Sequence, residues 1–540
     1  MKAALALALA VVAGAAGSAP ASQAATPRRG GTVVVALSQE PTCLNPLSST
    51  CRSAGVGYLA ALNQVLEGAF EIGPDLTYRE NLISSWEVTN KPFTVTYHIR
   101  PEASWSDGVP VTAGDFIFTY RKMLKNTGAY HWERILKFRT LNKKTLRVVF
   151  RVSDPDWREA FHWVLPRHVF AGEDPEAIWQ DAIDNPKTGE SIGSGPFLVE
   201  RFERGRQLAL VRNPRYWGPR TAYLDRIVFR FVAPDQLAES LRRGDVDVIA
   251  PGITESGAAA LEFRQKPAAG VTVVSGRGTF WQHLDFRVGA GGHPALKRRL
   301  VRQALAYGID RKAIVRKLGD LDLEPGSAVT PLDSVVFGVN SPFYRPNWSF
   351  YRYRPAEAQR LLGQAGCRPG ADGIYACEGE RLSLRAVTTA GVERRELQLR
   401  LVQSQLRRVG VDVQLEFVPS RVFFGTTLRS GDFDMALFAW GRGASLAGAY
   451  DVFGCKGVNN DTGYCSGPVH RDLVQTVRIL DLEQRVRVLN QVDVKLAKDV
   501  PVIPLFQPPF LTALRARLRG VVPNDAEGFT WNSEDWWLSR

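Results

Sequence analysis

One eight-residue pattern occurs twice in the chain, and it constrains the fold more than any other feature. Residues 241–248 read Leu-Arg-Arg-Gly-Asp-Val-Asp-Val, and residues 428–435 read Leu-Arg-Ser-Gly-Asp-Phe-Asp-Met. Both copies are typical of a helix that ends on a glycine and turns directly into a buried strand. We therefore expect two equivalent helix-to-strand corners, one in each of two α/β lobes.

The size and composition of the chain are those of a large globular protein. Its 540 residues are 45% hydrophobic and 23% charged, and a prior of about one domain per 150 residues predicts three or four structural units. The formal net charge of +13 is scattered among acidic residues, with no basic run interleaved with aromatic side chains. A nucleic-acid partner is therefore not expected.

The first 24 residues have the features of an export signal. Lys2 precedes a short apolar run over residues 3–13, and residues 19–21 or 22–24 can supply a cleavage site with small side chains. The run is too short to span a bilayer, and no later stretch reaches about 18 apolar residues. We expect an exported, soluble mature chain at the periplasmic or extracellular face of the membrane.

Six cysteines fall into three close pairs. None of the gaps has the two-residue spacing of a zinc knuckle or of a thioredoxin-like redox motif, so no metal site is expected from them. In an exported chain, local disulfides are the simplest interpretation, although fifteen connectivities are possible. We expect the nearest-neighbour pairing, which is Cys43 with Cys51, Cys367 with Cys377, and Cys455 with Cys465.

The stretch from residue 85 to residue 120 predicts a strand, a turn and a capped helix. Apolar and polar residues alternate over residues 93–100, which is typical of a half-buried strand. Ser-Asp-Gly at residues 106–108 predicts a turn. Thr112 is the expected N-cap of a helix that carries Asp115 in its first turn.

The choice of residues in this stretch resembles the signature of the family 5 extracellular solute-binding proteins. The resemblance rests on Trp-Ser-Asp-Gly at residues 105–108, followed by Pro110, Thr112 and Asp115. Other landmarks occur in the family's order, at residues 193–197, 212–217, 301–311 and 502–506. The resemblance covers essentially all of the mature chain. Many relatives are lipoproteins, but the first cysteine here is Cys43, too late to carry a lipid, so no lipid anchor is expected.

The resemblance implies an α/β, two-lobed periplasmic-binding-protein-like fold (type II, cluster C-like) with an inserted extra subdomain. After the signal at residues 1–24, lobe I would comprise residues 25–75, an inserted subdomain at 76–187, and a second part at 188–282. Lobe II would then extend over residues 283–502, and residues 503–540 would return to lobe I. In relatives, the chain crosses between the lobes near residues 280–286 and 502–506.

The resemblance also implies a function. Family members of this kind are the peptide- and nickel-type receptors of ABC importers, which capture a solute between the lobes and present it to the permease subunits. We expect this chain to act as a monomer without a cofactor, with peptides as its ligands. A receptor for a non-peptide solute, such as an oligosaccharide or a metal chelate, is the main alternative.

The loop after the strand at residues 435–440 is the expected ligand site, because ligands bind beyond the carboxyl ends of parallel strands. It offers Trp440, Gly441, Arg442, Ser445 and Tyr450. Arg442 suits a carboxylate, a phosphate or a sugar hydroxyl, or it pairs with a structural acid.

Two further positions complete the expected site. Trp281 is expected either in the opposite wall of the cleft or in the aromatic core. In relatives the loop after the first strand borders the cleft, so the resemblance implies the same for the loop that contains Asn45. Peptide-binding relatives carry an acid a few positions after the equivalent of Trp440, where it pairs with the peptide amino terminus. Here the nearest acid is Asp451, so recognition of a free amine is in doubt.

A secreted hydrolase is the rival interpretation. Residues 189–193 match Gly-x-Ser-x-Gly, but that elbow needs a buried strand before Ser191 and a helix after it. The flanking residues instead predict a loop. Two acidic pairs, at residues 245 and 247 and at residues 432 and 434, are expected at turns and strand edges. We expect neither a catalytic site nor a metal site.

Overall fold

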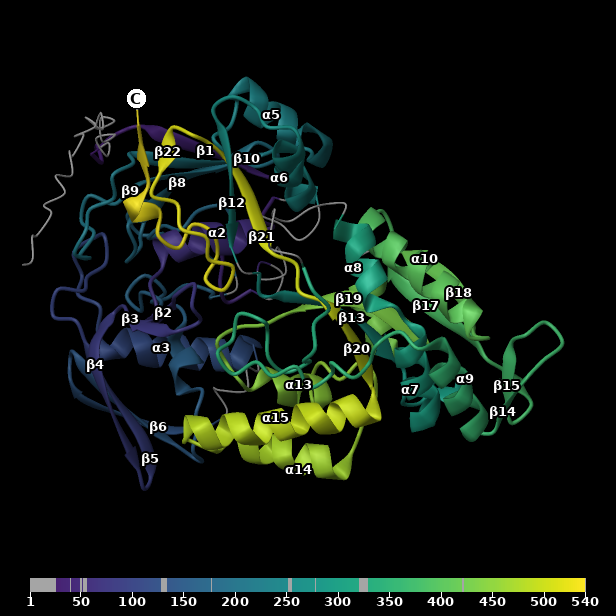
Figure 1. Cartoon of the computed structure of the whole chain (residues 1–540). Helices are drawn as coiled ribbons and strands as arrows, with labels where there is room; N and C mark the ends of the chain where they lie inside the picture. The colour runs from purple at the N-terminus through teal and green to yellow at the C-terminus, as the bar shows by residue number, and fades with distance from the viewer. Residues whose placement is uncertain are drawn as a thin grey trace, which may run out of the picture.

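The fold is described from a computed structural model of the chain. It covers residues 26–38, 40–48, 51, 56–127, 134–175, 177–250, 255–276, 278–319, 329–419 and 422–539. The predicted export signal lies outside these residues. Two large sheets dominate the architecture, and a third, antiparallel sheet lies beside them (Figure 1).

The first sheet has seven strands drawn from three separate parts of the chain. Parallel and antiparallel neighbours are mixed, with β1 parallel to both β10 and β11. Its strands in spatial order are β12 (Val271–Gly276), β21 (Phe510–Arg515), β11 (Val248–Ile249), β1 (Thr32–Leu37), β10 (Arg226–Phe231), β9 (Gln207–Arg212) and β8 (Phe197–Glu203). Helices α5 (Leu237–Arg243) and α6 (Glu255–Gln265) pack on this sheet.

The second sheet has five strands, in the order β18 (Asp412–Val418), β17 (Ser383–Thr389), β19 (Met435–Gly441), β13 (Phe280–Phe286) and β20 (Val502–Phe506). Strands β18 and β19 are parallel but do not pair, because β17 lies between them and is parallel to both. Several helices pack around this sheet: α7 (Arg299–Gly308), α8 (Arg311–Gly319), α9 (Pro355–Gln364), α10 (Glu393–Arg408) and α15 (Leu482–Asp499).

The repeated sequence pattern forms the same corner in both sheets. Helix α5 ends at Gly244 with φ of 82°, and α12 (Leu428–Ser430) ends at Gly431 with φ of 69°, both in the left-handed region. The second aspartate of each copy then accepts a backbone N–H from the neighbouring strand. Asp247 accepts from β1 at 3.0 Å, and Asp434 accepts from β17 at 2.8 Å. The predicted pair of lobe corners is therefore confirmed.

The third sheet has four antiparallel strands, β4 (Ile83–Asn90), β5 (Phe93–Ile99), β7 (Thr145–Phe150) and β6 (Ile135–Asn142), and α3 (Ala113–Thr127) follows its first hairpin. The predicted cap is present, because the side chain of Asp115 accepts from the Thr112 backbone at 2.7 Å and from its hydroxyl at 2.8 Å.

The prediction of a half-buried β5 is wrong. Thr94 and Thr96 are each 6% exposed, since β5 is central and Arg147 of β7 covers Thr96.

The chain passes between the two large sheets at two adjacent places. Residues 278 and 279 lead into β13 after β12, and residues 507–509 connect β20 to β21. The passages touch, because a Cβ atom on Gly278 would collide with the carbonyl oxygen of Pro508. Gln507 ties them further, because its side-chain amide donates to the backbone carbonyl of Gly278. Strands β13 and β20 lie wholly in the five-stranded sheet, so we propose lobe boundaries and a hinge at these two passages rather than at residues 282–283 and 502–503.

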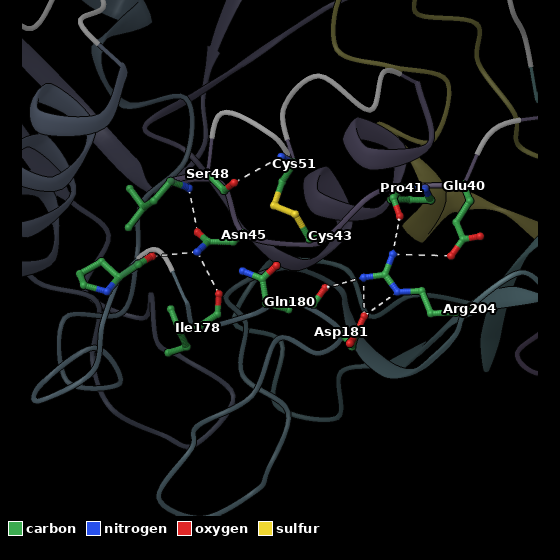
Figure 2. The surroundings of a disulfide bond; sticks show 12 residues. Glu40, Pro41, Cys43, Asn45, Ser48, Cys51, Ile178, Gln180, Asp181 and Arg204 are labelled. Carbon is green, nitrogen blue, oxygen red and sulfur yellow. Dashed lines mark hydrogen bonds and ion pairs between the residues drawn. A yellow bond between two sulfur atoms is a disulfide. The ribbon is translucent and has the colours of Figure 1, made fainter.

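The three nearest-neighbour disulfides are present in the structure. The first closes the loop after β1 (Figure 2), and the second joins strands of a small hairpin sheet. The remaining elements are short or peripheral: α2 (Val56–Val65), β2 (Phe70–Ile72), β3 (Tyr78–Glu80), η1 (Trp157–Phe161), η2 (Pro234–Gln236), η3 (Pro294–Lys297), β14 (Cys367–Pro369), β15 (Tyr375–Cys377), β16 (Glu380–Arg381), η4 (Phe423–Thr427), α13 (Gly448–Phe453), α14 (Gly467–Thr476), β22 (Leu518–Arg519), η5 (Ser533–Asp535) and β23 (Trp537–Leu538).

Candidate binding cleft

A cavity of about 530 Å³ lies between residues at β3 and η1, which adjoin the third sheet, and residues of the five-stranded sheet and its loops. One wall comes from residues 75–78 and 155–158, and the other from residues 335–343 and from the segment after β19. A shallower hollow of about 220 Å³ adjoins it and shares Leu76, Thr279 and Asn340 with it. Cavities of this size, with apolar walls and a few polar groups, are typical of small-ligand sites.

Aromatic side chains on one face of the five-stranded sheet form the floor of this cleft. Trp281 of β13 lies directly opposite Trp440 of β19 in the antiparallel register, so both project from the same face. His283 is fully buried behind them, with its ring centroid 4.5 Å from that of Trp281. The indole Nε1 of Trp440 is buried and has no hydrogen-bond partner among the described residues.

Arg442 leaves the end of β19 and lies over this floor. Its guanidinium carbon is 4.4 Å from the ring centroid of Trp281, and Nη2 donates to the carbonyl of Ser334 at 3.3 Å. The other terminal nitrogen, Nη1, is buried and has no hydrogen-bond partner in the described part of the chain. Burial lowers the pKa of Arg442 to about 9, against the opposing field of Asp493, so the side chain remains a cation at neutral pH.

Arg158 is the corresponding cation of the other wall. It belongs to η1, and its guanidinium carbon lies 4.3 Å from the ring centroid of Trp157 and 4.6 Å from that of Trp86. The rings of Phe70 and Tyr78 are within about 6 Å of it. Desolvation in this aromatic surround lowers the pKa of Arg158. No ion pair to Arg158 occurs among the described residues.

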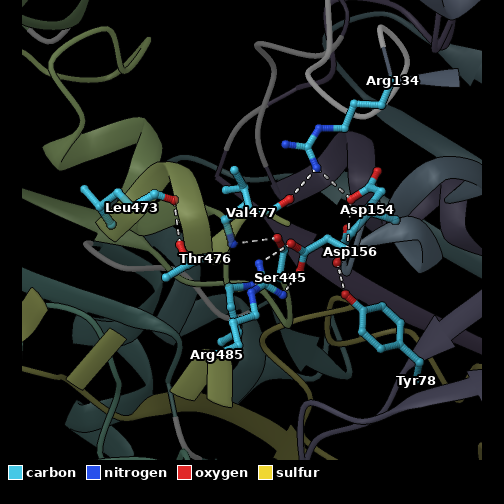
Figure 3. A network of polar contacts seen from close by, with 12 residues as sticks. Tyr78, Arg134, Asp154, Asp156, Ser445, Leu473, Thr476, Val477 and Arg485 are labelled. Atoms are coloured by element: carbon cyan, nitrogen blue, oxygen red, sulfur yellow. Dashed lines mark hydrogen bonds and ion pairs between the residues drawn. The ribbon is translucent and has the colours of Figure 1, made fainter. Parts of the chain in front are cut away.

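A buried ion pair joins the two walls (Figure 3). Arg485 of α15 donates to both carboxylate oxygens of Asp156, one of them at 3.0 Å, and the two side chains are 4% and 6% exposed. Asp156 also accepts from the backbone of Leu446 at 3.2 Å. Nearby, Arg134 donates to the carbonyl of Val477 at 2.7 Å. These contacts hold the third sheet against α14 and α15, which Figure 1 places beside it.

The geometry is that of a cleft in a two-lobed α/β protein, and comparison with known proteins identifies the family. A family model described as bacterial extracellular solute-binding proteins, family 5 middle, matches residues 77–457. The chain belongs to this family. Its members are the solute-binding receptors of ABC importers, which take a small ligand or peptide and interact with permease subunits, and they are not enzymes.

Relatives and solved structures of the family match nearly the whole chain. The oligopeptide-binding protein OppA of Mycobacterium tuberculosis is 29% identical over 510 residues, which cover 92% of this chain and 83% of that protein. The oligopeptide-binding protein AppA of Bacillus subtilis is 25% identical over 541 residues, or 96% and 93% of the two chains. The structure of the periplasmic EDTA-binding protein EppA superposes with a TM-score of 0.83 at 24% identity, covering 96% and 98%.

Most of the residues predicted for the ligand site in this family 5 protein lie together. Trp281, Trp440, Gly441, Arg442 and Ser445 all line the cleft. The alternative pairing of Arg442 with a structural acid is not observed within the described residues, where it forms no ion pair. Asp451, the nearest acid after Trp440, also lines the cavity.

Two predicted ligand residues lie elsewhere. Tyr450 is not among the residues that line the cleft; its ring faces His470, with centroids 6.0 Å apart. Asn45 is fully buried and organises its own loop (Figure 2). Its amide donates to the carbonyls of Pro175 and Ile178 at 2.8 and 2.9 Å, and its oxygen accepts from Leu47.

Three charged residues of the cleft were missed by sequence reasoning: Asp156, Arg158 and Arg485. They lie 280 or more residues from the Trp440 loop or on the outer helix α15, and no local motif marks them. Their polar roles depend on which surfaces face each other after folding. A possible signal was the placement of Trp157 and Arg158 just after strand β7, at an edge where a cleft wall can form.

The local structure around Ser191 does not form a nucleophile elbow. Ser191 lies in a single β-bridge with Asp184, between turns, and its hydroxyl donates to the carbonyl of Val199. The predicted turn and strand-edge roles of the paired aspartates are confirmed by the contacts of Asp247 and Asp434. Within the described residues, no group of three or more His, Cys, Asp or Glu side chains could hold a metal ion, and no helix is long and apolar enough to cross a membrane.

Proposed function

We propose that this family 5 receptor captures peptides in the cleft between its lobes and delivers them to the permease subunits of an ABC importer. The observation that carries the proposal is the enclosed cleft with aromatic floor and fixed cations, in a chain whose full-length relatives are named oligopeptide-binding proteins. The protein would act outside the cytoplasm as a monomer, after removal of the export signal and without a lipid anchor.

The proposed mechanism is ligand-stabilised closure. A ligand shifts the balance between open and closed forms only if it binds the closed form better, and it does so by contacting both walls. The cleft provides polar groups on each wall for this purpose, among them Arg158 on one side and Arg442 on the other. Hinge motion would take place at residues 278–279 and 507–509, where the chain passes between the sheets.

A non-peptide solute is the second candidate, and one feature of the cleft favours it. The positions just after Trp440 hold Gly441, Arg442, Gly443 and Ala444, with no acid to pair with a peptide amino terminus. A metal chelate or an oligosaccharide needs no such acid. One structurally similar protein is described as binding EDTA, and another as binding a nonapeptide, so the fold accommodates both kinds of ligand.

Native mass spectrometry of protein purified from its own source tests the proposal directly. A co-purified mass that fragments as a peptide supports peptide capture, whereas a sugar or a metal complex supports the second candidate. Small-angle scattering with and without that solute should report a smaller radius of gyration in the bound form. Bound solute without closure would overturn the receptor mechanism.

A further inference from the structure

The cleft contains two cations that form no ion pair with a carboxylate of the described chain. Arg442 and Arg158 line it from opposite walls, and neither forms an ion pair within the described residues. Both rest on aromatic rings instead, Arg442 on Trp281 and Arg158 on Trp157 and Trp86. Aromatic faces attract a cation but accept hydrogen bonds poorly, so the donors of each guanidinium remain available.

Two buried donors beside this floor lack an acceptor. Nη1 of Arg442 and Nε1 of Trp440 are both buried without a hydrogen-bond partner in the described chain. Residues 440 and 442 are two apart at the end of a strand, so their side chains leave the same face. A buried donor without a partner is costly, and most such groups in folded proteins are satisfied. An oxygen-rich anion at this position would satisfy both donors.

The other charged groups of the cleft are already engaged or lie at its margin. Arg485 and Asp156 neutralise each other. Asp75 is 59% exposed, accepts from the hydroxyl of Thr77 at 2.7 Å and lies 3.8 Å from Arg79. The remaining acid, Asp451, belongs to α13 in the same wall as Arg442. On the opposite wall Arg158 feels the field of Glu80 but forms no ion pair with it among the described residues.

We propose that the ligand of this cleft is a polycarboxylate, with one anionic group bound by Arg442 and Trp440 and a second bound by Arg158 on the opposite wall. An acidic peptide and a carboxylate-rich chelate share this chemistry. The inference rests on the proposed solute-receptor function and narrows its substrate. Because the two arginines stand on different walls, a ligand that bridges them stabilises the closed form, whereas a ligand with a single anionic group does not.

Calorimetric titration of the full mature chain tests this with three tripeptides of equal length: triglutamate, triglutamine and trilysine. A fourth probe, the Ni²⁺ complex of EDTA, separates a chelate from a peptide. Triglutamate or the chelate should bind at least about tenfold more tightly than triglutamine, because a hydrogen bond between two ionised groups is stronger than one between a guanidinium and a neutral amide. The preference should weaken as the salt concentration rises.

Arginine variants locate the effect. Arg442→Met and Arg158→Met keep a long apolar side chain against the aromatic rings and remove the charge. Each should weaken binding of the preferred anion by about tenfold to a hundredfold. Arg487→Met, on α15 at a side chain that is 66% exposed, is the matched control and should leave affinity unchanged. Thermal unfolding of each variant identifies any that fails to fold.

The outcomes distinguish the polycarboxylate inference from the proposal of peptide capture. Tight binding of triglutamate with loss in both variants supports the inference and peptide capture together. Binding of the chelate alone, with the same losses, supports the inference and overturns peptide capture. Binding of triglutamine or trilysine as tight as that of triglutamate, unaffected by the variants, overturns the inference while peptide capture stands. Binding of none of the four probes overturns both.

Discussion

Replacing Arg485 should open the cleft, because its buried pair with Asp156 joins the two walls only when they are closed. The side chains are 4% and 6% exposed and make a two-point contact. Removing one partner of a buried pair costs about 3–5 kcal/mol, since the other charge is left unpaired. In the open form water hydrates Asp156, so this cost falls on the closed form alone. A loss of about 3 kcal/mol corresponds to roughly 150-fold in the balance between closed and open forms.

The assay combines scattering with calorimetry. The Arg485→Met variant should have a larger radius of gyration than the parent without ligand, and it should bind the co-purified solute up to about 150-fold more weakly. Its thermal unfolding temperature should change little, because each lobe keeps its own core. Arg487→Met, two residues along the same helix and 66% exposed, should behave like the parent protein in every measurement.

A double variant separates a missing attraction from an unpaired charge. Adding Asp156→Asn to Arg485→Met removes the carboxylate that would be buried alone, so the double variant should recover part of the lost affinity. The reasoning is refuted if Arg485→Met lowers the unfolding temperature as a core defect would, while the radius of gyration and the affinity stay unchanged. The pair would then belong to a single rigid body.

Three further predictions concern stability. Burial raises the pKa of Glu67 from 4.5 to about 8, so within this window the unfolded chain has lost a proton that the folded chain keeps, and stability falls as the pH rises. As the pH rises through this range, the unfolding temperature of Glu67→Gln should therefore increase relative to that of the parent protein. A difference in unfolding temperature that stays constant with pH would contradict this. Asp434→Ala should cost about 2–4 kcal/mol in urea unfolding, because two backbone N–H groups lose their acceptor, whereas Asp432→Ala, 71% exposed, should cost less than about 0.5 kcal/mol. Replacing Cys367 and Cys377 by alanine should cost about 2–3 kcal/mol through the unfolded state and leave solute affinity unchanged, and a weaker affinity would show that this hairpin supports the cleft.

The features of the fold that the sequence predicted correctly are those that involve residues close together in the chain. The two glycine-ended corners could be predicted because a left-handed C-cap and the aspartate that follows it involve residues only a few positions apart. The same reason explains the capped start of α3 at Thr112 and the three disulfides between near neighbours. The exposure of β5 was mispredicted because a central strand is covered by neighbouring strands that alternation alone does not reveal.

The features of the cleft also separate into those that are local in the sequence and those that depend on tertiary packing. The sequence by itself determined that a Gly-rich loop with Trp440 and Arg442 follows a buried strand, since strand end and loop are contiguous in the chain. Only the tertiary structure decided that Trp281 lies under Arg442 and that Arg158 faces it from the other wall. Those residues are separated by more than a hundred positions, and their meeting depends on the packing of two sheets and on two short passages between them. Contacts of that kind are set by which surfaces become buried together, which no local pattern encodes.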